Sequence, residues 1–267
     1  MENAVNYPGK PAVRALILDM DGVLWRDNQP IGDLPWIFEK IYQLNWQVSL
    51  ATNNASRSVA QHREKLHKFG VELKPEQIIT SGEATASYLQ QRYPNGGNVF
   101  VVGESALEET LADKGFTISE KDVVAVVASF DRQLTYEKLK RAALLIRAGA
   151  PLIATNADLT FPMPEGLIPG AGSILASIVA ATQAKPTIIG KPEPEMYNLA
   201  IARMQAPEEA TLVVGDRLET DIAGAQMIGC QTALVLSGVT SLQSAESWQP
   251  SPDWVAEDLT ALIKNFL

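Results

Sequence analysis

Two aspartates, Asp19 and Asp21, stand one residue apart directly after the apolar run 15–18, and Gly22 follows them. Two carboxylates this close repel each other, so the edge of an apolar core gains no stability from holding both. The pair suits a reaction in which one carboxylate attacks as a nucleophile while the other donates and accepts a proton. Such a reaction needs further polar residues beside the pair.

Polar residues also follow three later apolar runs, 48–51, 187–190 and 212–215. These residues are Thr52 with Asn53, then Lys191, then Asp216 with Asp221 five residues further on. In an open parallel sheet, ligands bind beyond the carboxyl ends of the strands. We therefore expect these side chains to meet Asp19 at one edge of one sheet.

Acids, a hydroxyl and an ammonium at one edge suit phosphoryl transfer. A carboxylate can attack phosphorus and form an acyl phosphate, which divides hydrolysis into two easier steps. Mg²⁺ prefers a few carboxylates together with phosphate and water oxygens, and it neutralises clustered acids. Asp19 and Asp216, helped by Asp221, are therefore the expected magnesium ligands. Thr52, Lys191 and loop N–H groups are expected to hold the phosphoryl oxygens.

The elements that must position these residues are short apolar runs, rich in Val, Ile and Leu, that alternate with amphipathic stretches. The expected strands are residues 15–19, 48–52, 99–103, 123–129, 152–155, 187–190, 212–215 and 232–236. Their near-continuous apolar character is typical of strands buried on both faces. Residues 58–69 and 136–148 are predicted helices, each ended by a glycine. This alternation predicts an α/β fold with a parallel sheet.

The middle of the chain has more Pro- and Gly-rich interruptions than either end, which indicates a second domain inserted into the first. We expect residues 1–81 and 186–267 to form the catalytic core and residues 82–185 to form the insert.

The composition limits the class of protein. The chain has 267 residues, of which 46% are hydrophobic, and a net charge of -9 without a cluster of basic residues. Nucleic acid is therefore not an expected partner. No apolar run approaches the roughly 18 residues that a membrane span needs. The first residues do not form a secretory signal, and a single cysteine excludes an internal disulfide. We expect a cytoplasmic protein that does not bind membranes.

Four motifs stand in order along the chain: DMDGVL at 19–24, TNN at 52–54, GKP at 190–192 and GDRLETD at 215–221. Together they resemble the haloacid dehalogenase superfamily, which implies a Rossmann-like, doubly wound parallel sheet. The resemblance implies that Asp19 is the nucleophile, that Asp21 is the general acid/base and that Asp21 also binds the metal through its backbone carbonyl. The other implied roles are phosphate binding by Thr52 and Lys191 and magnesium binding by Asp19, Asp216 and Asp221.

Three more residues near these motifs are open in their roles. Gly22 is expected to have a backbone role, either because the chain needs a positive φ there or because the phosphate must approach closely. It therefore counts as a phosphate-binding candidate. Asn53 is a second such candidate, and it either donates to the phosphate or organises the loop. Arg217 pairs with Asp216 or reaches solvent.

The insert lies between the second and third motifs, which is the position of a C2-type cap domain. The segments FDRQLTYEKL (130–139), TNADLTFP (155–162) and PGAGSI (169–174) resemble the NagD-like, or 4-nitrophenylphosphatase, branch of the superfamily. That branch consists largely of phosphatases that act on small phosphate esters, among them nucleotides, sugar phosphates, phosphoglycolate and pyridoxal phosphate. The resemblance also allows a homodimer formed through the cap.

Substrate choice is expected to depend on the cap, with residues 156–165 as the specificity loop. Phe161 offers an apolar wall, whereas Asn156 and Asp158 either orient the leaving group or fold the loop. His62 and His67 are predicted to be exposed on a helix surface.

The favoured function is therefore a Mg²⁺-dependent phosphomonoesterase that acts on a small phosphorylated metabolite. A phosphomutase on the same scaffold is an alternative, although it needs a phosphate donor and a cap that excludes water. A carbon–halogen hydrolase is disfavoured because halide displacement needs no acid at Asp21. A non-enzymatic signalling module that accepts phosphate on an aspartate fits the clustered acids, but the chain length and the insert argue against it.

Overall fold

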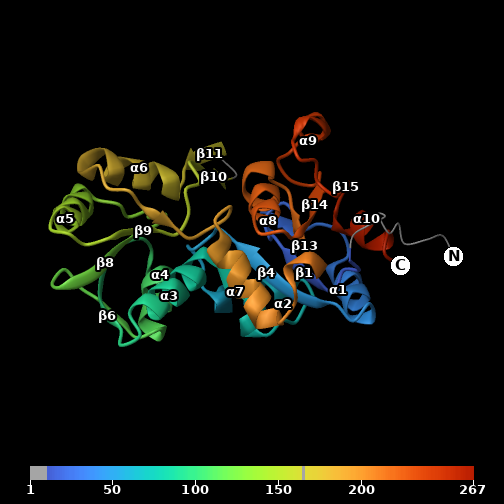
Figure 1. Cartoon of the computed structure of the whole chain (residues 1–267), viewed down its shortest axis with the longest axis horizontal. Coiled ribbons are helices and arrows are strands. Elements are labelled where there is room, and N and C mark those ends of the chain that lie inside the picture. Colours follow the sequence, from blue (N-terminus) through green and yellow to red (C-terminus); the bar gives the residue numbers. More distant parts are fainter. Residues whose placement is uncertain (1–10, 164–165) are drawn as a thin grey trace. The chain divides into compact units, whose positions relative to one another are not determined.

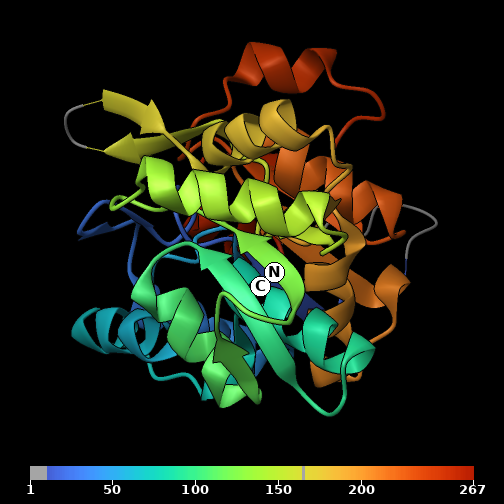
Figure 2. The ribbon, with the colours of Figure 1, turned by 90° about the vertical axis from the view of Figure 1, so that its left-hand side faces the viewer.

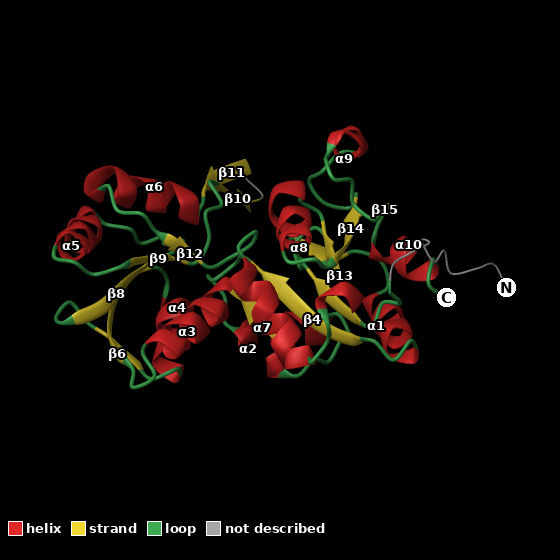
Figure 3. Cartoon of the chain, viewed as in Figure 1, coloured by secondary structure: helices red, strands yellow, loops and turns green. Residues whose placement is uncertain are grey.

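The computed structural model describes residues 11–163 and 166–267, which fold into two compact α/β units (Figures 1 and 3). Among these residues, the first unit comprises the chain up to Thr52 together with Val59–Ile79 and Tyr197–Leu267. The second unit comprises Asn53–Ser58 and Thr80–Met196. The predicted insert, residues 82–185, falls within the second unit, whose boundaries lie outside it on both sides.

A six-stranded sheet with the order β15-β14-β13-β1-β4-β5 forms the centre of the first unit. Its strands are β1 (Ala15–Leu18), β4 (Gln47–Thr52), β5 (Ile78–Thr80), β13 (Thr211–Gly215), β14 (Gln231–Val235) and β15 (Trp254–Ala256). The central strand β1 pairs in parallel with both β13 and β4, and all four of its residues are buried. A strand covered on both faces needs apolar residues throughout, which explains the unbroken ALIL run.

Helices complete the first unit around this sheet. They are α1 (Leu34–Gln43), α2 (Val59–Lys68), α8 (Ala223–Met227), α9 (Leu242–Ser247) and α10 (Leu259–Lys264), and α7 (Pro194–Met204) begins at the boundary between the units. Helix α1 is typical of them, because the Asp33 side chain caps its N-terminus and its buried residues recur at helical spacing. The apolar faces of α1, α2 and α10 form one large core cluster with the sheet, and α9 packs in a second, smaller cluster.

The second unit has its own parallel sheet, with the order β12-β9-β8-β6-β7. Its strands are β6 (Gly97–Val102), β7 (Phe116–Ile118), β8 (Val123–Ala128), β9 (Leu152–Ala154) and β12 (Thr187–Ile188). Helices α5 (Tyr136–Arg147) and α6 (Ala171–Thr182) cover one face, and α3 (Ser81–Arg92) and α4 (Ser105–Asp113) cover the other (Figure 2). A separate apolar cluster joins the sheet to α5 and α6, so this unit has a core of its own.

Short elements account for the rest. Two antiparallel hairpins join β2 (Trp25–Arg26) to β3 (Gln29–Pro30) and β10 (Thr160–Met163) to β11 (Gly166–Pro169). Single helical turns form η1 (Pro75–Gln77), η2 (Glu208–Ala210) and η3 (Leu218–Ile222). No helix in the described part of the chain is both long and apolar enough to cross a membrane.

The structure confirms the α/β class, the parallel sheets and both predicted helices, but it corrects two details. The strand expected at 187–190 pairs with β9 in the second sheet and not with the strands of the first. A short apolar run has the same pattern in either sheet, so the sequence cannot assign it. His62 was predicted to be exposed, but its side chain is buried because it shares a helix face with Leu66, whereas His67 is exposed.

Candidate active site

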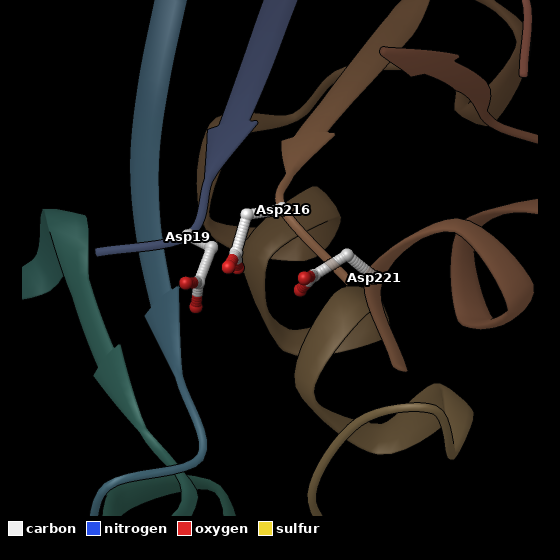
Figure 4. Close-up of side chains that lie close together, drawn as sticks. All are labelled: Asp19, Asp216 and Asp221. Carbon is white, nitrogen blue, oxygen red and sulfur yellow. The ribbon is translucent and has the colours of Figure 1, made fainter. Parts of the chain in front are cut away.

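Three carboxylates converge in the first unit. Asp19 directly follows β1 and Asp216 directly follows β13, so the parallel pairing of these strands brings both to the same edge of the sheet. Asp221 reaches them from η3, and each of the three offers an oxygen within 4.8 Å of the others. Figure 4 shows the three side chains directed toward one another. Asp216 and Asp221 are 2% and 1% exposed and Asp19 is 9% exposed, so water screens their repulsion poorly.

Glycines make room for this cluster. A Cβ on Gly238 would overlap Oδ2 of Asp216, and a Cβ on Gly22 would lie 2.6 Å from the same oxygen. A Cβ on Gly215 would overlap the Asp221 side chain. Gly22 also has a φ of +86°, a conformation that favours glycine. Glycine is therefore needed at these three positions, because a larger residue would collide with the carboxylates.

The loop after β14 holds Asp216 in place. The Val239 N–H donates to Asp216 Oδ2 at 2.9 Å, and the Thr240 hydroxyl donates to the Asp216 backbone carbonyl at 2.5 Å. Sequence reasoning missed this loop, including Gly238, because hydrogen bonds from a loop leave no spacing signal. Its only sequence mark is a short polar and glycine-containing segment after a buried strand.

Asp221 is fixed by its own turn. The Arg217 N–H donates to Asp221 Oδ2 at 3.1 Å, and the Asp221 N–H donates back to the Arg217 carbonyl at 3.1 Å. The Tyr197 hydroxyl contacts the carbonyls of Thr220 and Asp221 at 2.9 and 3.3 Å. Arg217 thus contributes to the site through its backbone.

Asp21 has a different environment. Its side chain is exposed and stands outside the group of three carboxylates, and its Oδ1 accepts a hydrogen bond of 2.7 Å from the indole Nε1 of Trp25. Gly22 next to it donates its N–H to the Trp25 carbonyl at 2.8 Å. That N–H is therefore engaged within the turn, and with the positive φ this matches the expected backbone role of Gly22; a contact with phosphate stays a prediction.

Thr52 lies at the edge where the acids meet. It is the last residue of β4, which pairs with β1 so that Leu50 is opposite Leu18. Thr52 is 3% exposed, and its strand position places it beside the chain that carries Asp19.

Asn53 and Lys191 form a tight pair in the second unit. The Lys191 N–H donates to Asn53 Oδ1 at 2.8 Å, and Asn53 Nδ2 donates to the Lys191 carbonyl at 3.0 Å and to Asp158 Oδ2 at 3.1 Å. An asparagine amide has two N–H donors, and both are used here. Of the two roles left open for Asn53, this geometry matches loop organisation and leaves its side chain no donor for a phosphate.

The cap residues continue this network. Asn156 Nδ2 donates to the Asn53 carbonyl at 2.8 Å, and Asn156 Oδ1 accepts from the Asp158 N–H at 3.0 Å. Phe161 stacks on Phe130 with ring centroids 5.1 Å apart and an interplanar angle of 21°. Asn156 and Asp158 are thus engaged in folding the loop, and a contact with a leaving group stays a prediction. Residues 164 and 165 of the expected loop lie outside the described residues.

Comparison with known proteins agrees with this arrangement. Residues 16–117 match a haloacid dehalogenase-like hydrolase model, and residues 188–262 match a second, HAD-hydrolase-like model. An acid sugar phosphatase of Staphylococcus epidermidis is 31% identical over 94% of this chain and 96% of its own length. The chain belongs to the haloacid dehalogenase-like hydrolases. Within this family it is a phosphomonoesterase, as its relatives are named.

Solved structures place it in the expected branch. The 4-nitrophenylphosphatase of Thermotoga maritima has a TM-score of 0.90 and 35% identity, covering 94% of this chain and 97% of that chain. NagD from Escherichia coli K-12 has a TM-score of 0.87 and 32% identity, covering 93% and 98%. The resemblance to NagD-like phosphatases is confirmed.

We predict that Asn53→Ala lowers the free energy of unfolding by about 1–3 kcal/mol, because it removes the two hydrogen bonds that the Asn53 side chain makes to the backbone of buried Lys191. Asn53→Asp should be no better, since a carboxylate oxygen would face Asp158 Oδ2 in place of a donor. Chemical denaturation measures both changes.

Asn198→Ala, at an exposed amide on α7, is the matched control and should stay within about 0.5 kcal/mol of the unmodified protein. If Asn53→Ala changed the free energy of unfolding no more than this control does, the hydrogen bonds of Asn53 would not contribute to stability.

Proposed function

We propose that this phosphatase is Mg²⁺-dependent and hydrolyses small phosphate monoesters through an aspartyl-phosphate on Asp19. The convergence of Asp19, Asp216 and Asp221 carries the proposal, because Asp19 stands at a strand end with its carboxylate beside two buried acids. The relatives named for sugar phosphates and for 4-nitrophenyl phosphate favour alkyl and aryl monoesters as substrates.

The residues present fit a magnesium ion. All three candidate ligand atoms are carboxylate oxygens, which Mg²⁺ prefers, and the glycines beside them make room for the Asp216 and Asp221 side chains. Asp19, Asp216 and Asp221 would hold the ion, with the backbone carbonyl of Asp21 as a fourth ligand by resemblance. When bound, the ion offsets the repulsion among the acids and the negative charge of the phosphoryl group.

The chemistry follows from the different settings of Asp19 and Asp21. The Asp19 carboxylate attacks phosphorus as the bond to the ester oxygen breaks, and Asp21 donates its proton to that oxygen. Asp21 then removes a proton from a water molecule that attacks the aspartyl-phosphate, which breaks the bond between Asp19 and phosphorus. Inorganic phosphate leaves, and Asp21 is protonated again. Thr52 and Lys191 are the proposed ligands of the phosphoryl oxygens.

The second unit is the proposed determinant of substrate choice. Its stacked rings of Phe130 and Phe161 offer a flat apolar surface, and the Asn156–Asp158 turn carries polar groups. This combination suits a small phosphorylated metabolite whose leaving group has both apolar and hydroxylated parts.

We predict that Asp19→Asn abolishes the release of phosphate, because an amide cannot form the phosphoenzyme. Asp21→Asn should retain substrate binding but lower kcat by about 10²–10⁴-fold, the usual contribution of a general acid/base. Phosphate release from sugar phosphates and from 4-nitrophenyl phosphate measures both. A folded Asp19→Asn protein with most of its activity would refute the mechanism.

We also predict that chelation of divalent cations stops turnover, that Mg²⁺ restores it, and that Gly238→Ala raises the Mg²⁺ concentration needed for half-maximal activity. The added methyl must displace Asp216, since the φ of Gly238 is accessible to alanine and only space is limiting. Gly82→Ala is the control, because its Cβ would meet a flexible leucine side chain at 3.3 Å. Equal Mg²⁺ requirements in the two variants would contradict a cation site at Asp216.

A further inference from the structure

Trp25 is the partner of the Asp21 side chain, and the mechanism above gives it no role. We propose that Trp25 is a positioning residue that orients Asp21 for proton transfer to the leaving group. The proposal rests on the proposed role of Asp21 as the general acid/base, and it assigns to Trp25 a part of the efficiency of that step.

The contact is built into the local backbone. Trp25 follows Asp21 by four residues, and the turn between them closes through a 2.8 Å bond from the Leu24 N–H to the Met20 carbonyl. The Gly22 N–H donates to the Trp25 carbonyl, also at 2.8 Å. This turn brings the indole back over Asp21, where Nε1 donates to Oδ1 at 2.7 Å.

The donor is rigid although its acceptor is exposed. Trp25 is only 1% exposed and belongs to the large core cluster. Its ring stacks on His62, with centroids 6.5 Å apart and an interplanar angle of 16°, and contacts Phe69 at 6.0 Å. The Lys65 ammonium lies 4.1 Å from the ring centroid and donates to the Asp27 carbonyl at 2.6 Å. An exposed carboxyl alone samples several rotamers, but a bond to this buried ring selects one.

The bond also distinguishes the two oxygens of Asp21. Oδ1 is engaged by the indole, which leaves Oδ2 as the oxygen that carries the proton to the ester oxygen and later accepts one from water. Indole nitrogen is a donor only, so Trp25 does not compete for the proton. Oδ1 can accept the same bond in both protonation states of Asp21, and the orientation is therefore kept through the whole cycle.

The test uses the leaving group. An alkoxide needs a proton as it departs, whereas 4-nitrophenolate leaves as a stable anion. Because kcat/KM reports the steps up to formation of the phosphoenzyme, a poorly oriented Asp21 should lower kcat/KM for alkyl phosphates selectively. We expect Trp25→Phe, which keeps an aromatic ring but loses the N–H, to lower kcat/KM about tenfold for the best substrate in a panel of sugar phosphates and phosphoglycolate. This is a small part of the about 10²–10⁴-fold contribution of a general acid. The value for 4-nitrophenyl phosphate should change little.

Two controls make the result interpretable. Trp46→Phe removes the same atoms from the same core cluster, but Trp46 immediately precedes β4 and so lies at the amino end of the strands, away from Asp21. It should leave the ratio of the two kcat/KM values unchanged. Asp21→Asn should show the selective loss more strongly than Trp25→Phe does.

The outcomes separate the two proposals. A selective loss in both Trp25→Phe and Asp21→Asn supports the positioning role. An equal loss on both substrates in Trp25→Phe, or no loss at all, overturns it, provided that Asp21→Asn remains selective. If Asp21→Asn itself shows no selectivity, the general-acid assignment fails, and the positioning role fails with it.

Discussion

The mutual repulsion of Asp19, Asp216 and Asp221 is the constraint on which the rest of the structure depends. Each offers an oxygen within 4.8 Å of the other two, and all are at least nine-tenths buried, where water screens charge weakly. Such a cluster needs a surrounding structure that holds it, and the proposed cation would offset its charge. The surrounding structure holds the carboxylates through the parallel register of β1 and β13, the glycines that contact Asp216 and the N–H of Val239.

The two aspartates of the first motif have different surroundings, which match the different roles proposed for them. In the proposed mechanism Asp19 is the nucleophile, and it lies with the other acids, where a bound cation would offset their charge. Asp21, only two residues later, has an exposed carboxyl whose contact is with the buried ring of Trp25. Its side chain stands apart from the three carboxylates that are the proposed metal ligands. In the second unit, one side-chain amide makes several contacts, because Asn53 forms hydrogen bonds with both the backbone of Lys191 and the Asp158 side chain.

Much of this site follows from the sequence, because the end of a buried parallel strand is a position that periodicity can locate. Asp19, Thr52 and Asp216 were found in this way, and β1, β4 and β13 occur where expected. The sheet that β12 joins could not be predicted, since a two-residue pairing with β9 leaves no distinct pattern. The partners of Asp21 and Asn53 and the burial of His62 depend on how side chains meet in three dimensions. Residue spacing carries no record of such contacts, and this is why the sequence left the roles of Gly22 and Asn53 open.

The central claim is that Asp19 carries the phosphoryl group during turnover. The most direct measurement is to quench the enzyme with acid during hydrolysis of a phosphate monoester, reduce the acyl phosphate with borohydride and sequence the peptides by mass spectrometry. The account predicts homoserine at position 19, formed only when substrate is present and absent in Asp19→Asn. Reduction at Asp21 or Asp216, or turnover without any reducible aspartate, would contradict it.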